Sequence, residues 1–79
     1  MTLGEYLREL RMEAHMTAET VAKALGHQSK QSLYNWENDT RVPPLGVLSH
    51  LCKIYGVEPD TVREALVSAY NNKLKKEGL

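Results

Sequence analysis

Three amide side chains lie on one side of a short helical segment in the middle of the chain. At 100° per residue this side is opposite an apolar pair, Leu33 and Trp36, so the amides point to solvent. The three amides, which we call the amide face, are Gln31, Asn35 and Asn38. A carboxamide can pair with an adenine edge through two hydrogen bonds, which discriminates against other bases by about 1–3 kcal/mol. Gln31 and Asn35 are therefore candidates for reading bases in DNA.

Two further polar residues occupy the first turn of the same segment. Lys30 can bind a guanine edge or a phosphate, and Ser32 can do the same or remain a local cap. Tyr34 flanks the amide face and can touch a phosphate or a thymine methyl group, or pack as a partly exposed aromatic. The alternative for all these side chains is that they are solvated residues on an amphipathic helix.

An acidic residue falls on the buried side of this segment. Glu37 follows Leu33 and Trp36 at helical spacing, and a buried carboxylate needs a partner. Arg11 stands at the edge of the apolar stripe of an earlier helix and is the available cation. We predict an ion pair between Arg11 and Glu37 that locks the first helix against the third.

Residues suited to catalysis or to metal binding are sparse. The three histidines are scattered, and His50 and Cys52 lie at i and i+2, on different faces of a helix. The sequence contains no glycine-rich phosphate loop and no nucleophile at a useful spacing from a base. We expect no enzymatic activity, no metal site and no cofactor.

Capping signals divide the first half of the chain into three helices. The expected N-caps are Thr2, Thr17 and Ser29. Thr2 forms a capping box with Glu5, and the first helix runs from residue 3 to about residue 14. Gly26 ends the second helix as a left-handed residue. The second and third helices, joined by a tight turn, predict a helix-turn-helix unit over residues 17–38.

Two more helices are expected after a break at residues 39–44, where Pro43 and Pro44 prevent a helix. The fourth runs from about residue 44 to residue 55, and Pro59 suits the first turn of the fifth. The side chains expected to face inward from the fourth are Leu45, Leu48, Leu51, Cys52 and Tyr55. On the fifth, Tyr70 and Leu74 are predicted to form a two-fold dimer contact, the alternative being that they fold back on the domain. No strand pattern occurs, so we predict an all-α domain of five helices.

Composition is typical of one small globular domain of 79 residues. The ten basic and ten acidic residues give a net charge of zero, which predicts only a few phosphate contacts in any complex with DNA. A single cysteine excludes an internal disulfide, and no apolar run is long enough to cross a membrane. These features predict a cytoplasmic protein.

Three short motifs give the chain a family resemblance. LRELR in the first helix, LG at the end of the second and WEN at the end of the third resemble the Cro and lambdoid-repressor-like family, also called the xenobiotic-response-element helix-turn-helix family. The resemblance covers about residues 3–57 and implies a lambda-repressor-like fold, with a DNA-binding domain over residues 1–57 and a further helix over 58–79. It also implies the Arg11–Glu37 pair and base-facing positions for Gln31 and Asn35.

Contacts to the DNA backbone are expected beside this base-reading surface. Thr17 and the free amides at the start of the second helix form an anion site. The resemblance implies that Arg41 grips a phosphate. Asn38 and Tyr34 are further candidates for contacts to the DNA backbone.

The chain departs from the family pattern at four places. Ala18 replaces a glutamine that helps to grip a phosphate, and one extra residue stands in the turn at His27-Gln28. Asp39 replaces the usual glycine after the third helix, and Pro44 replaces the usual serine cap of the fourth. The first two departures bear on how the domain docks on DNA.

Together these patterns predict a homodimeric, sequence-specific regulator of transcription that binds double-stranded DNA. The expected form is a bacterial or phage repressor located at the nucleoid. Each third helix would enter a major groove, at half-sites about 34 Å apart. One alternative is an antitoxin that binds DNA and also neutralises a toxin protein through the fifth helix. The other is a helix-turn-helix adaptor that binds only proteins.

Overall fold

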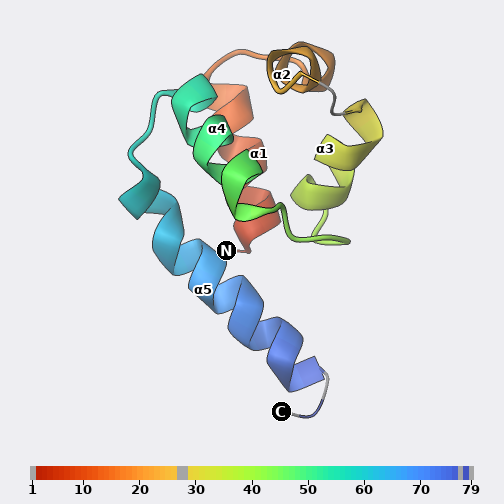
Figure 1. Ribbon diagram of the computed structural model, residues 1–79, viewed down its shortest axis with the longest axis vertical. Helices are drawn as coiled ribbons and strands as arrows, with labels where there is room; N and C mark the ends of the chain where they lie inside the picture. The colour runs from red at the N-terminus through yellow and green to blue at the C-terminus, as the bar shows by residue number, and fades with distance from the viewer. Residues whose placement is uncertain (1, 27–28, 77, 79) are drawn as a thin grey trace.

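The computed structural model describes residues 2–26, 29–76 and 78, with the backbone alone at residues 69, 70, 72–74 and 76. Its five helices are α1 (Leu3–Glu13), α2 (Ala18–Ala24), α3 (Lys30–Glu37), α4 (Leu45–Tyr55) and α5 (Pro59–Lys76) (Figure 1). The described residues contain no strand, so the predicted all-α class is confirmed. The first three helices begin and end close to their predicted bounds because their capping residues are specified locally.

The predicted N-caps are confirmed. The side-chain oxygens of Thr2, Thr17 and Ser29 each accept a hydrogen bond from the backbone N–H three residues later, at 3.1 Å. Gly26 and Gly56 adopt φ angles of 87° and 70°, the left-handed conformation that lets α2 and α4 end sharply. These signals fix where α2 stops and where α3 starts.

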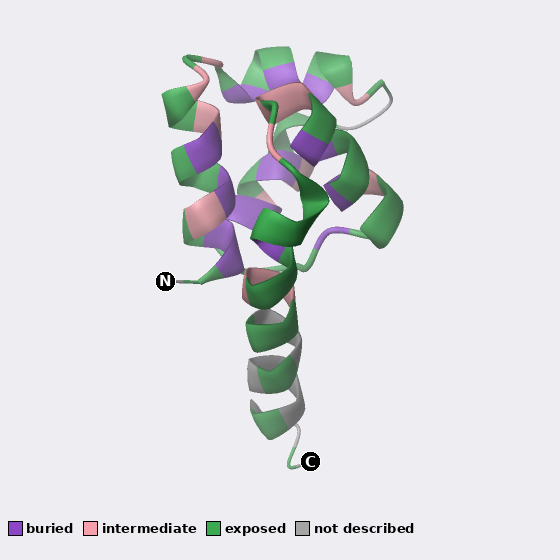
Figure 2. Cartoon of the chain, turned by 90° about the vertical axis from the view of Figure 1, so that its left-hand side faces the viewer, coloured by how far each residue is buried: buried purple, intermediate pink, exposed green. Residues whose placement is uncertain are grey.

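One apolar core joins all five helices. Its fully buried members are Leu7 of α1, Val21 of α2, Leu33 of α3 and Leu51 of α4. Val62 contributes from the start of α5, and Figure 2 shows the buried residues gathered in the upper part of the molecule. α3 packs on both α1 and α2, so it is held from two sides.

Leu45 is a correction to the predicted core. Its side chain is 72 % exposed although it shares a stripe with Leu48 and Cys52, which are buried. Leu45 is the first residue of α4, and the residue before it, Pro44, is also exposed. The inward stripe therefore starts one turn later than periodicity alone predicts.

α5 runs beyond the rest of the domain. Ala65 and Leu66 pack partly against the core, but Val67 is 52 % exposed, and the second half of the helix extends away from the other helices (Figures 1 and 2). The predicted dimer residues Tyr70 and Leu74 have side chains that lie outside the described part. Among the described residues, no helix is long and apolar enough to cross a membrane.

Asp39 connects the end of α3 to the start of α1. Its Oδ1 accepts a hydrogen bond from the Gly4 backbone N–H at 2.9 Å, and its Oδ2 accepts one from the Thr2 hydroxyl at 2.6 Å. The residue has a φ of 64°, a left-handed conformation that aspartate tolerates better than most residues. Asp39, which replaces the usual glycine of the family, thus caps the N-terminus of α1 through Gly4, 35 positions earlier in the chain.

Replacing Asp39 with alanine is expected to lower the free energy of unfolding by about 1–2 kcal/mol, because it removes both hydrogen bonds and leaves a strained backbone. Asp39→Asn keeps an acceptor for the Gly4 N–H and the tolerance of a left-handed φ, so it should lose less. Urea denaturation of the two variants measures the difference. An alanine variant as stable as the wild type would contradict this account of the cap.

Candidate nucleic-acid interface

The helix-turn-helix unit presents one outward polar surface on α3. Leu33 is fully buried and Trp36 is 5 % exposed, so the inner side of the helix is fixed in the core. Lys30 and Gln31 are exposed, and Ser32 and Asn35 are partly exposed. The turn residues His27 and Gln28, where the extra residue was predicted, lie outside the described part.

The amide face is ordered by one side-chain contact. Gln31 Nε2 donates a hydrogen bond to Asn35 Oδ1 at 3.1 Å. Asn38 is engaged differently, because its Oδ1 accepts hydrogen bonds from the backbone N–H and the hydroxyl of Thr40. The side-chain oxygen of Asn38 therefore stabilises the turn after α3, and the side-chain nitrogen Nδ2 is the group left to contact a phosphate.

Ser32 and the two flanks complete the predicted set of DNA contacts. The Ser32 hydroxyl lies 3.1 Å from the Ser29 hydroxyl, so the structure brings Ser32 into the cap of its own helix. On one flank, the Thr17 hydroxyl caps α2 and pairs with Thr20 at 2.9 Å. On the other flank, the exposed Arg41 donates its backbone N–H to the carbonyl of Asn35 at 3.1 Å, which ties the loop to α3.

Arg11 and Glu37 form a two-pronged ion pair behind α3. Arg11 Nε lies 2.7 Å from Glu37 Oε2, and Arg11 Nη2 lies 3.0 Å from Oε1. The side chains are 14 % and 5 % exposed, and Arg11 Nη1 also donates to the Met16 carbonyl at 3.1 Å. The hydrogen bond to Glu37 raises the pKa of Arg11 against the lowering effect of burial. The pair thus joins α1, the loop before α2, and α3.

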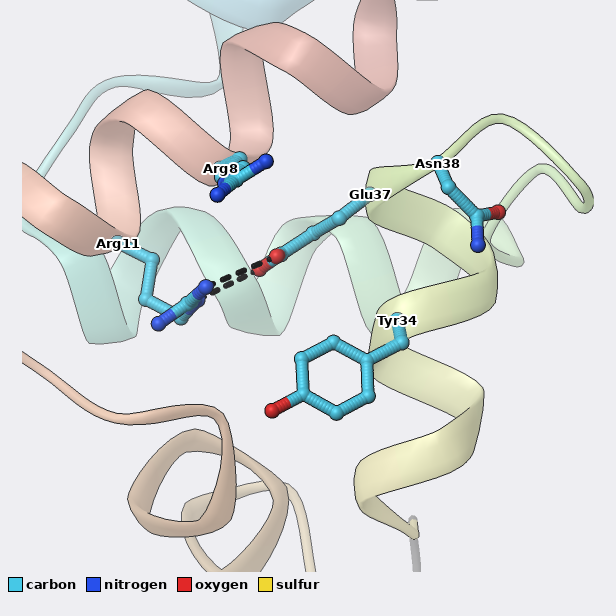
Figure 3. Close-up of a pocket in the computed structure, with 5 residues that line it drawn as sticks. All are labelled: Arg8, Arg11, Tyr34, Glu37 and Asn38. Carbon is cyan, nitrogen blue, oxygen red and sulfur yellow. Dashed lines mark hydrogen bonds and ion pairs between the residues drawn. The ribbon is translucent and has the colours of Figure 1, made fainter.

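An open pocket of about 450 Å³ lies beside this ion pair. Its walls are Arg8 and Arg11 of α1 and Tyr34, Glu37 and Asn38 at the end of α3 (Figure 3). Both oxygens of Glu37 accept from Arg11, so the carboxylate charge is already matched. The charge of Arg8 is then in excess, and the pocket favours an anion.

Arg8 belongs to this surface although the sequence pattern did not predict it there. The apolar stripe of α1 predicted that Arg8 points away from the core, and Arg8 is indeed exposed. The available signal was its spacing from Arg11: residues three apart lie about 60° apart around a helix and are neighbours on its surface. This spacing places Arg8 beside Arg11 on α1, and the crossing of α1 over α3 then brings it near Glu37.

Two other titratable groups of α4 are held neutral by burial. Desolvation raises the pKa of the Cys52 thiol, so this cysteine is a core residue and a poor nucleophile. Desolvation also strongly raises the pKa of Tyr55, with a further rise from the nearby Glu37 carboxylate. The Tyr55 hydroxyl is buried without a hydrogen-bond partner among the described residues. Across that same part of the chain, no three acidic, cysteine or histidine side chains are grouped to hold a metal ion.

Replacing Tyr55 with phenylalanine is expected to leave stability unchanged or to raise it by up to about 1 kcal/mol, because a buried hydroxyl without a partner is removed. The advantage of the variant should grow above the ordinary tyrosine pKa of 10.0, since only the unfolded wild-type side chain then ionises. Urea midpoints at about pH 8 and about pH 11 measure both effects. A variant that loses more than about 1 kcal/mol would show that the hydroxyl makes a favourable contact.

Comparison with known families agrees with this geometry. A family model described as a helix-turn-helix domain matches residues 2–66, which is most of the chain. The protein belongs to this helix-turn-helix domain family, and the resemblance to regulators of the xenobiotic-response-element type is confirmed. Comparisons with curated proteins and with solved structures found no match.

Proposed function

We propose that the protein is a sequence-specific regulator that binds double-stranded DNA and inserts α3 into the major groove. The observation that carries the proposal is the contrast between the two sides of this helix. Its inner side is fixed by Leu33, Trp36 and the Glu37 ion pair, and its outer side presents the amides. A rigid helix with an exposed polar surface is what base reading in a helix-turn-helix complex requires.

The proposed contacts follow from position. Lys30, Gln31 and Asn35 face the bases, with Ser32 as a weaker contact because its hydroxyl already joins the Ser29 cap. Phosphates are met by side chains at one end of the amide face and on both of its flanks. These are Arg8, Thr17, Tyr34, Asn38 and Arg41. With no net charge on the whole chain, the cations of this surface supply most of the attraction to DNA, and these are Arg8, Lys30 and Arg41.

We further propose that the protein works as a homodimer and as a repressor in the nucleoid. The extension of α5 beyond the core and the exposure of Val67 support an association through this helix. A dimer that occupies two major-groove half-sites about 34 Å apart would block access to the DNA between them.

Selection from a random duplex pool at low salt tests the proposal. The wild-type protein should enrich one sequence with two-fold symmetry, and retention of no sequence would contradict the DNA-binding function. Co-purification of a second protein with the wild type would instead favour the antitoxin alternative.

The salt dependence of binding distinguishes arginines that contact phosphates from arginines that do not contact the DNA. Arg41→Ala and Arg8→Ala should each weaken binding and reduce the slope of log K against log salt by about 0.9. Arg63→Ala is the matched control, because Arg63 lies on α5 and is exposed beside Asp60. It should leave both affinity and slope unchanged.

A further inference from the structure

The hydrogen bond between Gln31 and Asn35 links the two side chains that were predicted to read bases separately. Both start from the outer side of α3, four positions apart, so one lies above the other along the helix. The contact is 3.1 Å long and runs from the Gln31 amide nitrogen to the Asn35 carbonyl oxygen. Its direction sets which end of each amide faces its neighbour.

The bond does not use up the edge with which Gln31 would read a base. A glutamine nitrogen carries two hydrogens, and its carbonyl oxygen accepts independently. A two-bond contact with adenine uses the oxygen and one hydrogen. The second hydrogen of Gln31 is the one donated to Asn35, so both contacts can exist together.

Asn35 stands in a different situation. Its oxygen accepts from Gln31, and the residue is only partly exposed, whereas Gln31 is exposed and lies in the first turn of α3, the part of a recognition helix that approaches the bases most closely. Asn35 is therefore better suited to fix the amide rotation of Gln31 than to read a second adenine. No side chain at the first position of α2 can hold the Gln31 amide instead, because Ala18 is buried and has no polar side-chain atom.

We propose that Gln31 and Asn35 form a single reading unit, in which Gln31 contacts an adenine edge and Asn35 is its positioning residue. This inference rests on the proposed DNA-binding function. Holding Gln31 in one rotamer before binding removes part of the ordering cost that a free side chain would incur in the complex. The unit therefore specifies one base pair where two independent amides would specify two.

Single-base substitutions in the selected duplex test the proposal. The affinity of every substituted duplex is measured for the wild type, Gln31→Ala, Asn35→Ala and the double variant. Both side chains are on the surface, so melting temperatures should match the wild type. We expect both single variants to lose discrimination at the same base pair. Their affinity for the selected duplex should fall about 10- to 100-fold. The double variant should be no weaker than Gln31→Ala.

Lys30→Ala provides the control. In a double variant with Gln31→Ala, the factors by which the two substitutions weaken DNA binding should multiply. Loss of discrimination at different base pairs in the two single variants, or no loss in Asn35→Ala, would overturn the proposal and leave the DNA-binding function intact. A wild-type protein that selects no duplex would overturn the function itself and this inference with it.

Discussion

Replacing Arg11 with alanine is expected to lower the free energy of unfolding by about 3–5 kcal/mol, the usual cost of leaving a buried charge without its partner. The Glu37 carboxylate is 5 % exposed and receives both of its side-chain hydrogen bonds from Arg11. Water that enters from the open pocket beside the pair can solvate the carboxylate in part, so the loss should lie toward the lower end of this range. The same substitution also releases the loop before α2, because it removes the bond to the Met16 carbonyl.

Urea denaturation measures this loss, and two further variants make the result specific. Arg63→Ala breaks an ion pair with Asp60 in which both side chains are more than 70 % exposed, so it should change stability by less than about 1 kcal/mol. Glu37→Leu combined with Arg11→Ala removes both charges and should recover part of the loss. If Arg11→Ala is as mild as Arg63→Ala, the pair does not fasten α3.

Gly4→Ala is expected to be nearly as damaging, at about 2–3 kcal/mol, because the new methyl group meets backbone atoms. A Cβ at this position would lie 2.6 Å from the carbonyl oxygen of Trp36 and closer still to that of Glu37. It would also approach the Asp39 carboxylate to 2.8 Å. Since the end of α3 cannot yield as a flexible side chain would, α1 must move away from it.

Gly46→Ala is a close control for this substitution. Gly46 lies near the start of α4, as Gly4 lies near the start of α1, but an added Cβ would meet nothing within 4 Å. Because alanine favours helix, this variant should be as stable as the wild type or up to about 1 kcal/mol more stable. Thermal unfolding should show a lower melting temperature for Gly4→Ala and an unchanged or higher one for Gly46→Ala. If Gly4→Ala had the same melting temperature as Gly46→Ala, α1 and α3 would not be in close contact.

Features determined by neighbours in sequence could be predicted. The caps at Thr2, Thr17 and Ser29 each depend on residues within one turn, and the glycines that end helices depend on backbone conformation alone. Periodicity placed Glu37 on the buried side of its helix, and the available cation, Arg11, at the edge of the apolar stripe of α1.

Features that depend on how helices meet could not be predicted. The bond from Asp39 to Gly4 joins residues 35 positions apart, and no local pattern announces it. Leu45 follows the stripe of α4 but lies where no other described element covers it. The pocket beside Arg8 requires the crossing of α1 over α3, and the direction of the Gln31–Asn35 bond requires side-chain coordinates.

We propose that the outer side of α3 contacts DNA. An NMR titration of the labelled protein with a mixed-sequence duplex at low salt tests it most directly, because non-specific binding uses the same surface as specific binding. The largest amide shifts should fall in residues 29–38, with smaller shifts near Thr17 and Arg41, while α5 stays unchanged apart from any dimer effect already present without DNA. Shifts confined to α4 and α5, or no shifts at all, would contradict the claim.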